Sequence, residues 1–244
     1  DASSTLYTGP ITLTSTTSLR AVAVMSGFTD SQPANEAYMI DDARNMPVLY
    51  LTTDPDNFFD DEIGIYVDGT NGVVGYCSSV PVNWAQDWER PCNLKMFMPD
   101  GTIAFDVNAG VEISGACSRN NAMKSLAINL REKVFGSDEL NFEPFPQREL
   151  DKYQRFKIRT SGQDYFRLGF RDMLNQTLLF KDIDIEAQAG RPVILYLNGE
   201  FWGLHNMREK YAGEHFEELY DVDEDDLDII KSPGLPWRDI KKGF

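Results

Sequence analysis

The sequence VILYLNGEFWGLHNMREK, residues 193–210, contains the strongest hairpin signal in the chain. Two apolar runs, 193–197 and 201–207, flank the dipeptide Asn198-Gly199. An Asn-Gly pair between two such runs favours a tight turn in which both residues adopt positive φ. This stretch therefore predicts two antiparallel strands of one sheet.

The segments on either side of this hairpin predict an α+β domain. Apolar residues recur at helical spacing over residues 165–180, which predicts the main helix, and a shorter helix is expected at 214–220. Upstream, runs of larger apolar residues predict strands at 48–51, 63–67, 92–97, 103–105, 110–115, 122–130 and 156–159. We therefore expect an antiparallel sheet that carries one main helix.

The first 40 residues have a different texture, rich in Thr and Ser. Alternating residues predict strands at 11–14 and 19–25 and a last strand that ends at Ile40. The acidic segment 41–46, just before Pro47, is the expected linker. A segment of this size cannot build a complete β-sandwich. Either its partner strands lie upstream, or its strands dock on the domain that comes next in the chain.

The charge of the chain argues against two classes of partner. Lys and Arg together number 23 against 39 Asp and Glu, a formal charge of −16. Such a charge repels nucleic-acid phosphates and anionic lipid surfaces. No stretch approaches the roughly 18 consecutive apolar residues of a membrane span, and residue 1 opens in polar sequence without a signal peptide. We expect an excised or processed piece that neither binds nucleic acid nor inserts into a membrane.

Two of the three cysteines bracket a compact aromatic loop. Cys77 and Cys92 enclose Trp84 and Trp88, which predicts a Cys77–Cys92 disulfide and leaves Cys117 free. Closing such a loop stabilises a fold by about 3 kcal/mol and implies an oxidising compartment. The alternative, unpaired thiols in a cytosolic protein, stays open on the sequence alone.

Four stretches in register resemble the spore coat CotH kinase-like family. They are MPVLYLTTDPDNFFDDEIGIYV (46–67), GVEISGACSRNNAMKSLAINL (110–130), LGFRDML (168–174) and VILYLNGEFWGLHNMREK (193–210). The resemblance covers residues 46 to about 231. The N-terminal pattern is similar to the closing strands of a chitobiase/β-hexosaminidase C-terminal-like module. Together they imply a partial β module at 1–40, a linker at 41–46, and a CotH kinase-like domain at 47–244 that is truncated before its catalytic lobe.

The fold that the resemblance implies is a partial immunoglobulin-like β unit followed by a divergent protein-kinase N-lobe. The parent protein would bind ATP with Mg²⁺ or Mn²⁺ and phosphorylate Ser or Thr of secreted or coat proteins. It would act outside the cell, on the cell surface or in the spore coat, and its N-terminal module would contact glycans. The alternative is a non-catalytic structural or adhesive surface protein. Paired catalytic and metal-binding aspartates in the downstream sequence would favour the kinase, and their absence there would favour the structural protein.

Lys124 is the main candidate for phosphate binding. Strand alternation places it on the same face as Leu126 and Ile128, where an ammonium is costly unless it is paired. The resemblance makes Lys124 the phosphate-gripping lysine and Asp172, on the main helix, the carboxylate that holds it. A lysine at the strand end that extends to solvent is the alternative.

Four further residues complete the expected nucleotide site. Ser118 and Arg119 lie in the loop above the phosphates, which lacks the usual Gly-rich pattern, so a plain turn with a surface arginine stays open. Met207 and Glu209 fall where a kinase hinge presents backbone groups to adenine, although Glu209 also fits the start of a solvated helix. We expect no catalytic or metal-binding residue and no bound cofactor in this chain alone, and no phosphate transfer by it. Its two histidines, His205 and His215, are too few for a His-rich zinc site.

Overall fold

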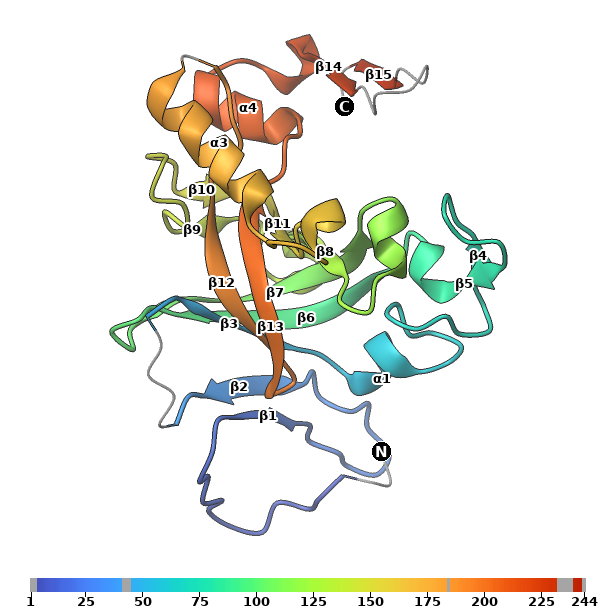
Figure 1. Ribbon diagram of the computed structural model, residues 1–244. Helices are drawn as coiled ribbons and strands as arrows, with labels where there is room; N and C mark the ends of the chain where they lie inside the picture. Colours follow the sequence, from blue (N-terminus) through green and yellow to red (C-terminus); the bar gives the residue numbers. More distant parts are fainter. Residues whose placement is uncertain (1–3, 41–44, 184, 232–238, 243–244) are drawn as a thin grey trace.

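The core of the computed structural model is a closed seven-stranded β-barrel (Figure 1). The structure describes residues 4–40, 45–183, 185–231 and 239–242. In spatial order the barrel strands are β11 (Arg155–Arg159), β13 (Glu200–Glu209), β12 (Gly190–Leu197), β3 (Val48–Thr52), β6 (Glu89–Phe97), β7 (Ile103–Ser114) and β8 (Ser125–Asn129). The pairing of β11 with β8 closes the barrel.

Helices and short strands decorate this barrel. The α-helices are α1 (Pro55–Phe59), α2 (Glu132–Phe135), α3 (Arg171–Asp182) and α4 (Gly213–Tyr220), and the 3₁₀ helices are η1 (Asn83–Ala85), η2 (Cys117–Asn120), η3 (Gly162–Asp164) and η4 (Glu224–Asp226). The remaining strands are β1 (Thr17–Ala21), β2 (Ala34–Tyr38), β4 (Val73–Val74), β5 (Pro81–Val82), β9 (Leu140–Asn141), β10 (Lys152–Tyr153), β14 (Asp228–Lys231) and β15 (Asp239–Lys242). No helix in the described part of the chain has the length and apolar content needed to cross a bilayer.

The predicted hairpin at residues 193–210 is confirmed as β12 and β13. Asn198 and Gly199 have φ of 51° and 88°, the positive values that the tight turn requires. Strand alternation then points Val193, Leu195 and Met207 into the main core, where each is fully buried.

The N-terminal strands β1 and β2 form a hairpin that docks on the outside of the barrel (Figure 1). Ala37 of β2 belongs to a second buried cluster with Tyr50, Phe97 and Tyr196 of the barrel strands. Glu36 accepts a 2.5 Å hydrogen bond from the buried ammonium of Lys95 in β6. Of the two alternatives for this segment, the described residues therefore show docking on the barrel.

The expected α+β kinase N-lobe is wrong, because the described chain is mostly β and closes into a barrel with few helices. The pairing that joins the two ends of the domain is non-local: β12 runs parallel to β3, so Ile194 lies opposite Val48. The predicted strand at 63–67 is a loop after α1, and the predicted strands at 103–105 and 110–115 are one strand, β7. The main helix begins at Arg171 rather than at 165, because Gly169 has φ of 71° and interrupts the helical path.

Candidate functional site

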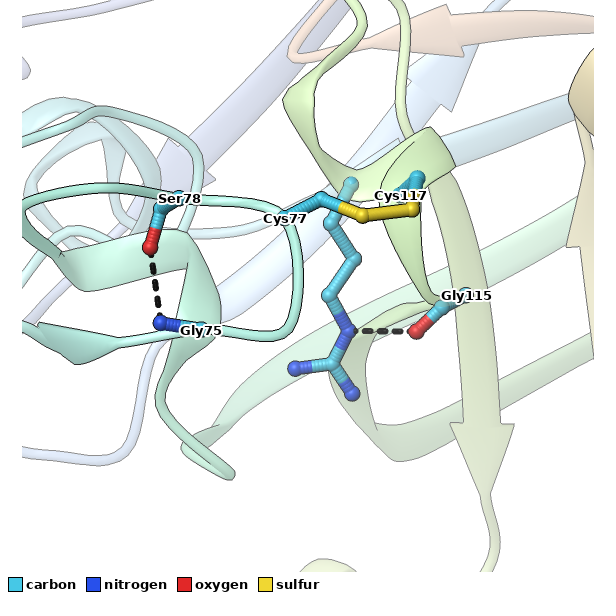
Figure 2. Close-up of a disulfide and its surroundings, with 6 residues drawn as sticks. Gly75, Cys77, Ser78, Gly115 and Cys117 are labelled. Carbon is cyan, nitrogen blue, oxygen red and sulfur yellow. Dashed lines mark hydrogen bonds between the residues drawn. A yellow bond between two sulfur atoms is a disulfide. The ribbon is translucent and has the colours of Figure 1, made fainter. Parts of the chain in front are cut away.

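A disulfide anchors the loop that contains η2. Figure 2 shows Cys77, beside the turn from Gly75 to Ser78, joined to Cys117 after Gly115. The two Cα atoms are 4.9 Å apart. Gly115 has φ of 124°, and a Cβ there would clash with the Ser118 hydroxyl, so this bend requires glycine. The disulfide therefore fixes the loop from residue 115 to residue 120 to the turn at residues 75–78.

The predicted Cys77–Cys92 disulfide is wrong. Cys92 is a free thiol in β6, only 7% exposed, and it packs in the main core with Leu94 and Met96. Its alternating position turns the sulfur into the barrel and away from the loop that holds Cys77. Burial raises the pKa of the Cys92 thiol well above its usual range.

Lys124 lies immediately before β8 and is buried, with only 6% of its surface exposed. Its ammonium donates hydrogen bonds to the carbonyl oxygens of Arg119, at 2.6 Å, and Asn121, at 3.0 Å. It also lies 5.4 Å from the centre of the Tyr66 ring and 5.3 Å from that of Trp84. Burial lowers the pKa of Lys124 to about 8, although the charge of Asp68 acts in the opposite direction. These direct contacts are carbonyl oxygens and ring faces, not carboxylates.

Arg119 places a second cation on the same loop. Its Nε donates a 2.8 Å hydrogen bond to the Gly115 carbonyl, the bond drawn at Gly115 in Figure 2. One terminal nitrogen lies 3.7 Å from the almost fully exposed carboxylate of Asp87. Ser118 lies between Cys117 and Arg119 and is half-buried. The structure therefore brings together three of the predicted site residues: Ser118, Arg119 and Lys124.

Asp172 is not the partner of Lys124. Its carboxylate binds the guanidinium of the buried Arg208 and lies 3.4 Å from Arg159. Strand alternation explains this: Ile158 and Met207 point into the core, so Arg159 and Arg208 point outward, toward α3. The barrel wall thus separates Asp172 from Lys124.

Met207 and Glu209 lie apart from Lys124 as well. Strand β13 is paired on both sides, with β11 and β12, up to Arg208, so the backbone groups of residues 206–208 are occupied in the sheet. The Glu209 amide donates to the Ala189 carbonyl, and its carbonyl accepts a hydrogen bond from Gln188, so neither is presented to a ligand. In the register, Met207, Ile158 and Leu126 form one row. Glu209 lies two residues from that row in one direction and Lys124 two residues in the other. The residues predicted for the nucleotide site therefore do not form one cluster.

A second polar cluster surrounds Glu209 at the other end of the barrel interior. Glu209 is fully buried and accepts hydrogen bonds from the Tyr153 hydroxyl, at 2.9 Å, and the Ala189 amide, at 2.7 Å. Arg148 forms ion pairs with both Glu209 and Glu186. Burial raises the pKa of Glu209, whereas for Glu186 the hydrogen bonds and the charge of Arg148 outweigh burial and lower it.

Sequence reasoning missed this second cluster, because its members come from distant loops and strands. Glu186, Glu209 and His215 have ligand-type atoms that all lie within 4.8 Å of one another. His215 and Tyr153 also line a small surface pocket beside α4. The one local sequence signal for this cluster was the Met-Arg-Glu-Lys end of the hairpin, which places the acid Glu209 at a buried strand position.

The fold and the loop define a β-barrel domain that carries a disulfide-anchored cationic loop between β7 and β8. A family model described as CotH kinase protein matches residues 111–238, more than half of the chain. The chain therefore belongs to the CotH kinase protein family. The match begins within β7 and includes η2, Lys124, α3 and the β12–β13 hairpin. It does not extend to residues 1–40, and their resemblance to a chitobiase-like module is not supported. No curated protein matches the chain.

Proposed function

We propose that the loop around η2 contacts the phosphates of ATP through Lys124 and Arg119, as part of a CotH-family protein kinase. The parent protein would phosphorylate Ser or Thr of coat or extracellular proteins. The observation that carries the proposal is the buried ammonium of Lys124, whose direct hydrogen-bond acceptors are two neutral carbonyl oxygens.

The electrostatic state of Lys124 supports an anionic ligand. Taking an ammonium out of water is costly, and carbonyl oxygens compensate this cost less than an opposite charge does. An ammonium has three N–H donors, and the two carbonyl bonds leave one for another acceptor. A phosphate would offset the buried charge through a charge-assisted hydrogen bond. Arg119, on the same loop, offers a second cation in a chain that is otherwise strongly acidic.

The side chains around Lys124 suit a phosphate ligand better than a metal ion. Asp68 is the acid that acts electrostatically on Lys124, and one of its oxygens already accepts a 2.6 Å hydrogen bond from Trp84. Among the described residues, the acids and histidine with metal-ligand spacing are Glu186, Glu209 and His215, and Asp68 is not one of them. We therefore assign phosphate contact to Lys124 and Arg119 and place no metal ion beside them.

The Cys77–Cys117 disulfide supports a place outside the cytoplasm. Disulfides persist in oxidising compartments and are rare in the cytosol. This favours a secreted, surface or spore-coat location for the parent protein, with secreted or coat proteins as its substrates. Peptide mapping of the protein isolated from its native compartment tests the location: the proposal expects the disulfide intact.

Calorimetric titration of the full-length parent protein with ATP and Mg²⁺ tests the proposed function. Lys124→Met should weaken nucleotide binding by at least about tenfold, because the loss of a charge-assisted hydrogen bond costs about 1.5–3 kcal/mol. Lys133→Met is the matched control, since Lys133 is exposed on α2, and it should bind within about twofold of wild type.

Two results would contradict the proposal. One is equal affinity of the Lys124→Met and wild-type proteins for ATP, with both folded. The other is the absence of any binding by the wild-type parent protein at millimolar nucleotide, which would favour the alternative of a non-catalytic structural or adhesive surface protein.

A further inference from the structure

Glu186, Glu209 and His215 form a cluster that the nucleotide proposal does not use. Glu209 ends β13, His215 lies in α4, and Glu186 lies in the loop before β12. Their side chains each offer one ligand-type atom, and these atoms lie within 4.8 Å of one another. Glu209 lies in register with Ile128, four residues along the chain from Lys124, so the cluster is separate from the proposed nucleotide site.

His215 points into this cluster without a partner. It is only 7% exposed, and its Nε2 has no hydrogen-bond partner among the described residues. The same nitrogen lies 4.0 Å from Glu209 Oε2, too far for a hydrogen bond. A neutral imidazole carries a lone pair on one ring nitrogen, and this lone pair can bind a metal ion. A buried nitrogen left unsatisfied is costly, and a cation between it and the carboxylate would satisfy both.

Surrounding donors hold both carboxylates in place. Glu209 is oriented by the Tyr153 hydroxyl and the Ala189 amide. Glu186 accepts hydrogen bonds from the hydroxyls of Tyr211, at 3.1 Å, and Tyr220. Outer hydrogen bonds of this kind orient the carboxylate ligands of metal ions in proteins.

Arg148 offers the competing explanation, a closed ion network without a metal. Its Nε lies 2.7 Å from Glu209 Oε1, and its terminal nitrogen binds Glu186 Oε1. One guanidinium against two carboxylates leaves one negative charge, and Arg148 approaches Oε1 of Glu209 whereas His215 faces Oε2. Without a metal, the network thus leaves His215 Nε2 without a hydrogen-bond partner, whereas a bound cation would give this nitrogen a partner.

We propose that Glu186, Glu209 and His215 bind a divalent transition-metal ion, for which Zn²⁺ is the best fit. Imidazole with carboxylates suits Zn²⁺, whereas Mg²⁺ and Ca²⁺ prefer all-oxygen sites. Metal–ligand bonds of about 2.0–2.2 Å place tetrahedral ligand atoms about 3.4 Å apart, so ligand atoms that are now up to 4.8 Å apart must close by up to about 1.4 Å. His215, one of the three ligands, also lines the small pocket beside α4. The bound ion ties α4 to the end of the barrel.

Equilibrium dialysis of the metal-free chain against Zn²⁺, with the bound metal measured by mass spectrometry, tests the site. Wild type should bind one Zn²⁺ per chain, and Zn²⁺ should raise its melting temperature. His215→Phe should weaken Zn²⁺ binding by at least about 100-fold, because it removes the nitrogen but keeps an aromatic ring against Tyr153 and Tyr211. His205→Phe is the matched control: it removes the other buried imidazole and should keep wild-type affinity.

Co²⁺ provides an independent readout, since a bound Co²⁺ ion with His and carboxylate ligands gives visible d–d absorption that His215→Phe should lose. If His215→Phe does not fold, Glu186→Gln decides, because Glu186 lies in a surface loop and glutamine keeps its hydrogen-bond acceptor; it should bind Zn²⁺ at least about tenfold more weakly. No stoichiometric Zn²⁺ on wild type at micromolar metal, or equal affinity of the folded His215 or Glu186 variant, would overturn the inference. Neither result bears on nucleotide binding at Lys124.

Discussion

Lys124 Nζ donates a 2.6 Å hydrogen bond to the carbonyl of Arg119, which ties a buried ammonium to the η2 loop. The same loop carries Cys117, whose disulfide to Cys77 fixes it to the turn after β4. The position of the ammonium therefore depends on a loop that a covalent bond holds in place, and a change in that loop should reach Lys124.

The disulfide gives the first prediction. Peptide mapping without reduction should recover Cys77 linked to Cys117, and denatured protein should show one free thiol, that of Cys92. The Cys77→Ser/Cys117→Ser double variant should lose about 3–4 kcal/mol of unfolding free energy, because the crosslink closes a loop with a sequence separation of 40. The recovery of a Cys77–Cys92 peptide would show that the loop is arranged differently.

Asp172→Asn should affect stability and not nucleotide binding. The change removes the negative charge that faces the buried Arg208 guanidinium, although Gln188 still accepts a 2.6 Å hydrogen bond from it. We expect a loss of about 2 kcal/mol in the free energy of unfolding. Chemical denaturation measures this loss, and titration with ATP should give wild-type affinity. A parallel loss of affinity in the folded variant would return Asp172 to the nucleotide site.

Lys95 should anchor the N-terminal hairpin through two carboxylates. Its buried ammonium contacts Glu36 at 2.5 Å and Asp106 at 3.0 Å. Glu36→Gln and Asp106→Asn should each cost less than about 1 kcal/mol, since the other carboxylate remains, but the double variant should cost about 3 kcal/mol. Denaturation of the three variants at pH 7 measures this non-additivity, and additive losses would contradict it.

The same pairs predict a pH dependence. Burial lowers the pKa of Lys95, but its hydrogen bonds to Glu36 and Asp106 outweigh burial and raise the pKa above the ordinary 10.5. A pKa raised in the folded state stabilises below the unfolded value, and this stabilisation is lost as the pH rises through the folded value. The double variant should therefore differ from wild type at pH 7 by more than it does above pH about 11.

His205 should make the fold sensitive to acid. Burial lowers its pKa from 6.5 to about 4, so between these values the unfolded chain binds a proton that the folded chain does not. The free energy of unfolding therefore falls as the pH falls from 6.5 toward 4, by up to about 1.4 kcal/mol per pH unit. His205→Phe removes this contribution. The difference between the two denaturation curves in metal-free buffer should change by about 2 kcal/mol from pH 7 to pH 4.5, and a constant difference would contradict the burial of a neutral imidazole.

The sequence predicted local features well. The β12–β13 hairpin followed from Asn198-Gly199, and the burial of Lys124 is consistent with its spacing to Leu126 and Ile128, because turn geometry and strand alternation are properties of a short stretch. The short helix at 214–220 was also close to the observed α4, Gly213–Tyr220.

Non-local features were beyond the sequence. The parallel pairing of β12 with β3 brings Ile194 opposite Val48, far apart in the chain, and no spacing in either strand encodes its partner. The Asp172 prediction failed for the same reason: helical periodicity locates Asp172 on a helix but does not show on which side of the barrel wall that helix packs. Cys117 approaches Cys77 only once β7 and the loop after β4 are in place.

Chemical labelling of Lys124 in the full-length parent protein with an acyl-phosphate derivative of ATP tests the central claim most directly. Such a probe transfers its acyl group to a lysine amine that lies beside the bound phosphates, and a lysine with pKa about 8 has a substantial neutral fraction at pH 7.5. The account predicts that mass spectrometry finds the acyl group on Lys124, that excess ATP prevents the labelling, and that the exposed Lys133 shows no such protection. Labelling of Lys124 that ATP does not reduce, or ATP-protected labelling confined to other lysines, would contradict a phosphate-contacting role for the η2 loop.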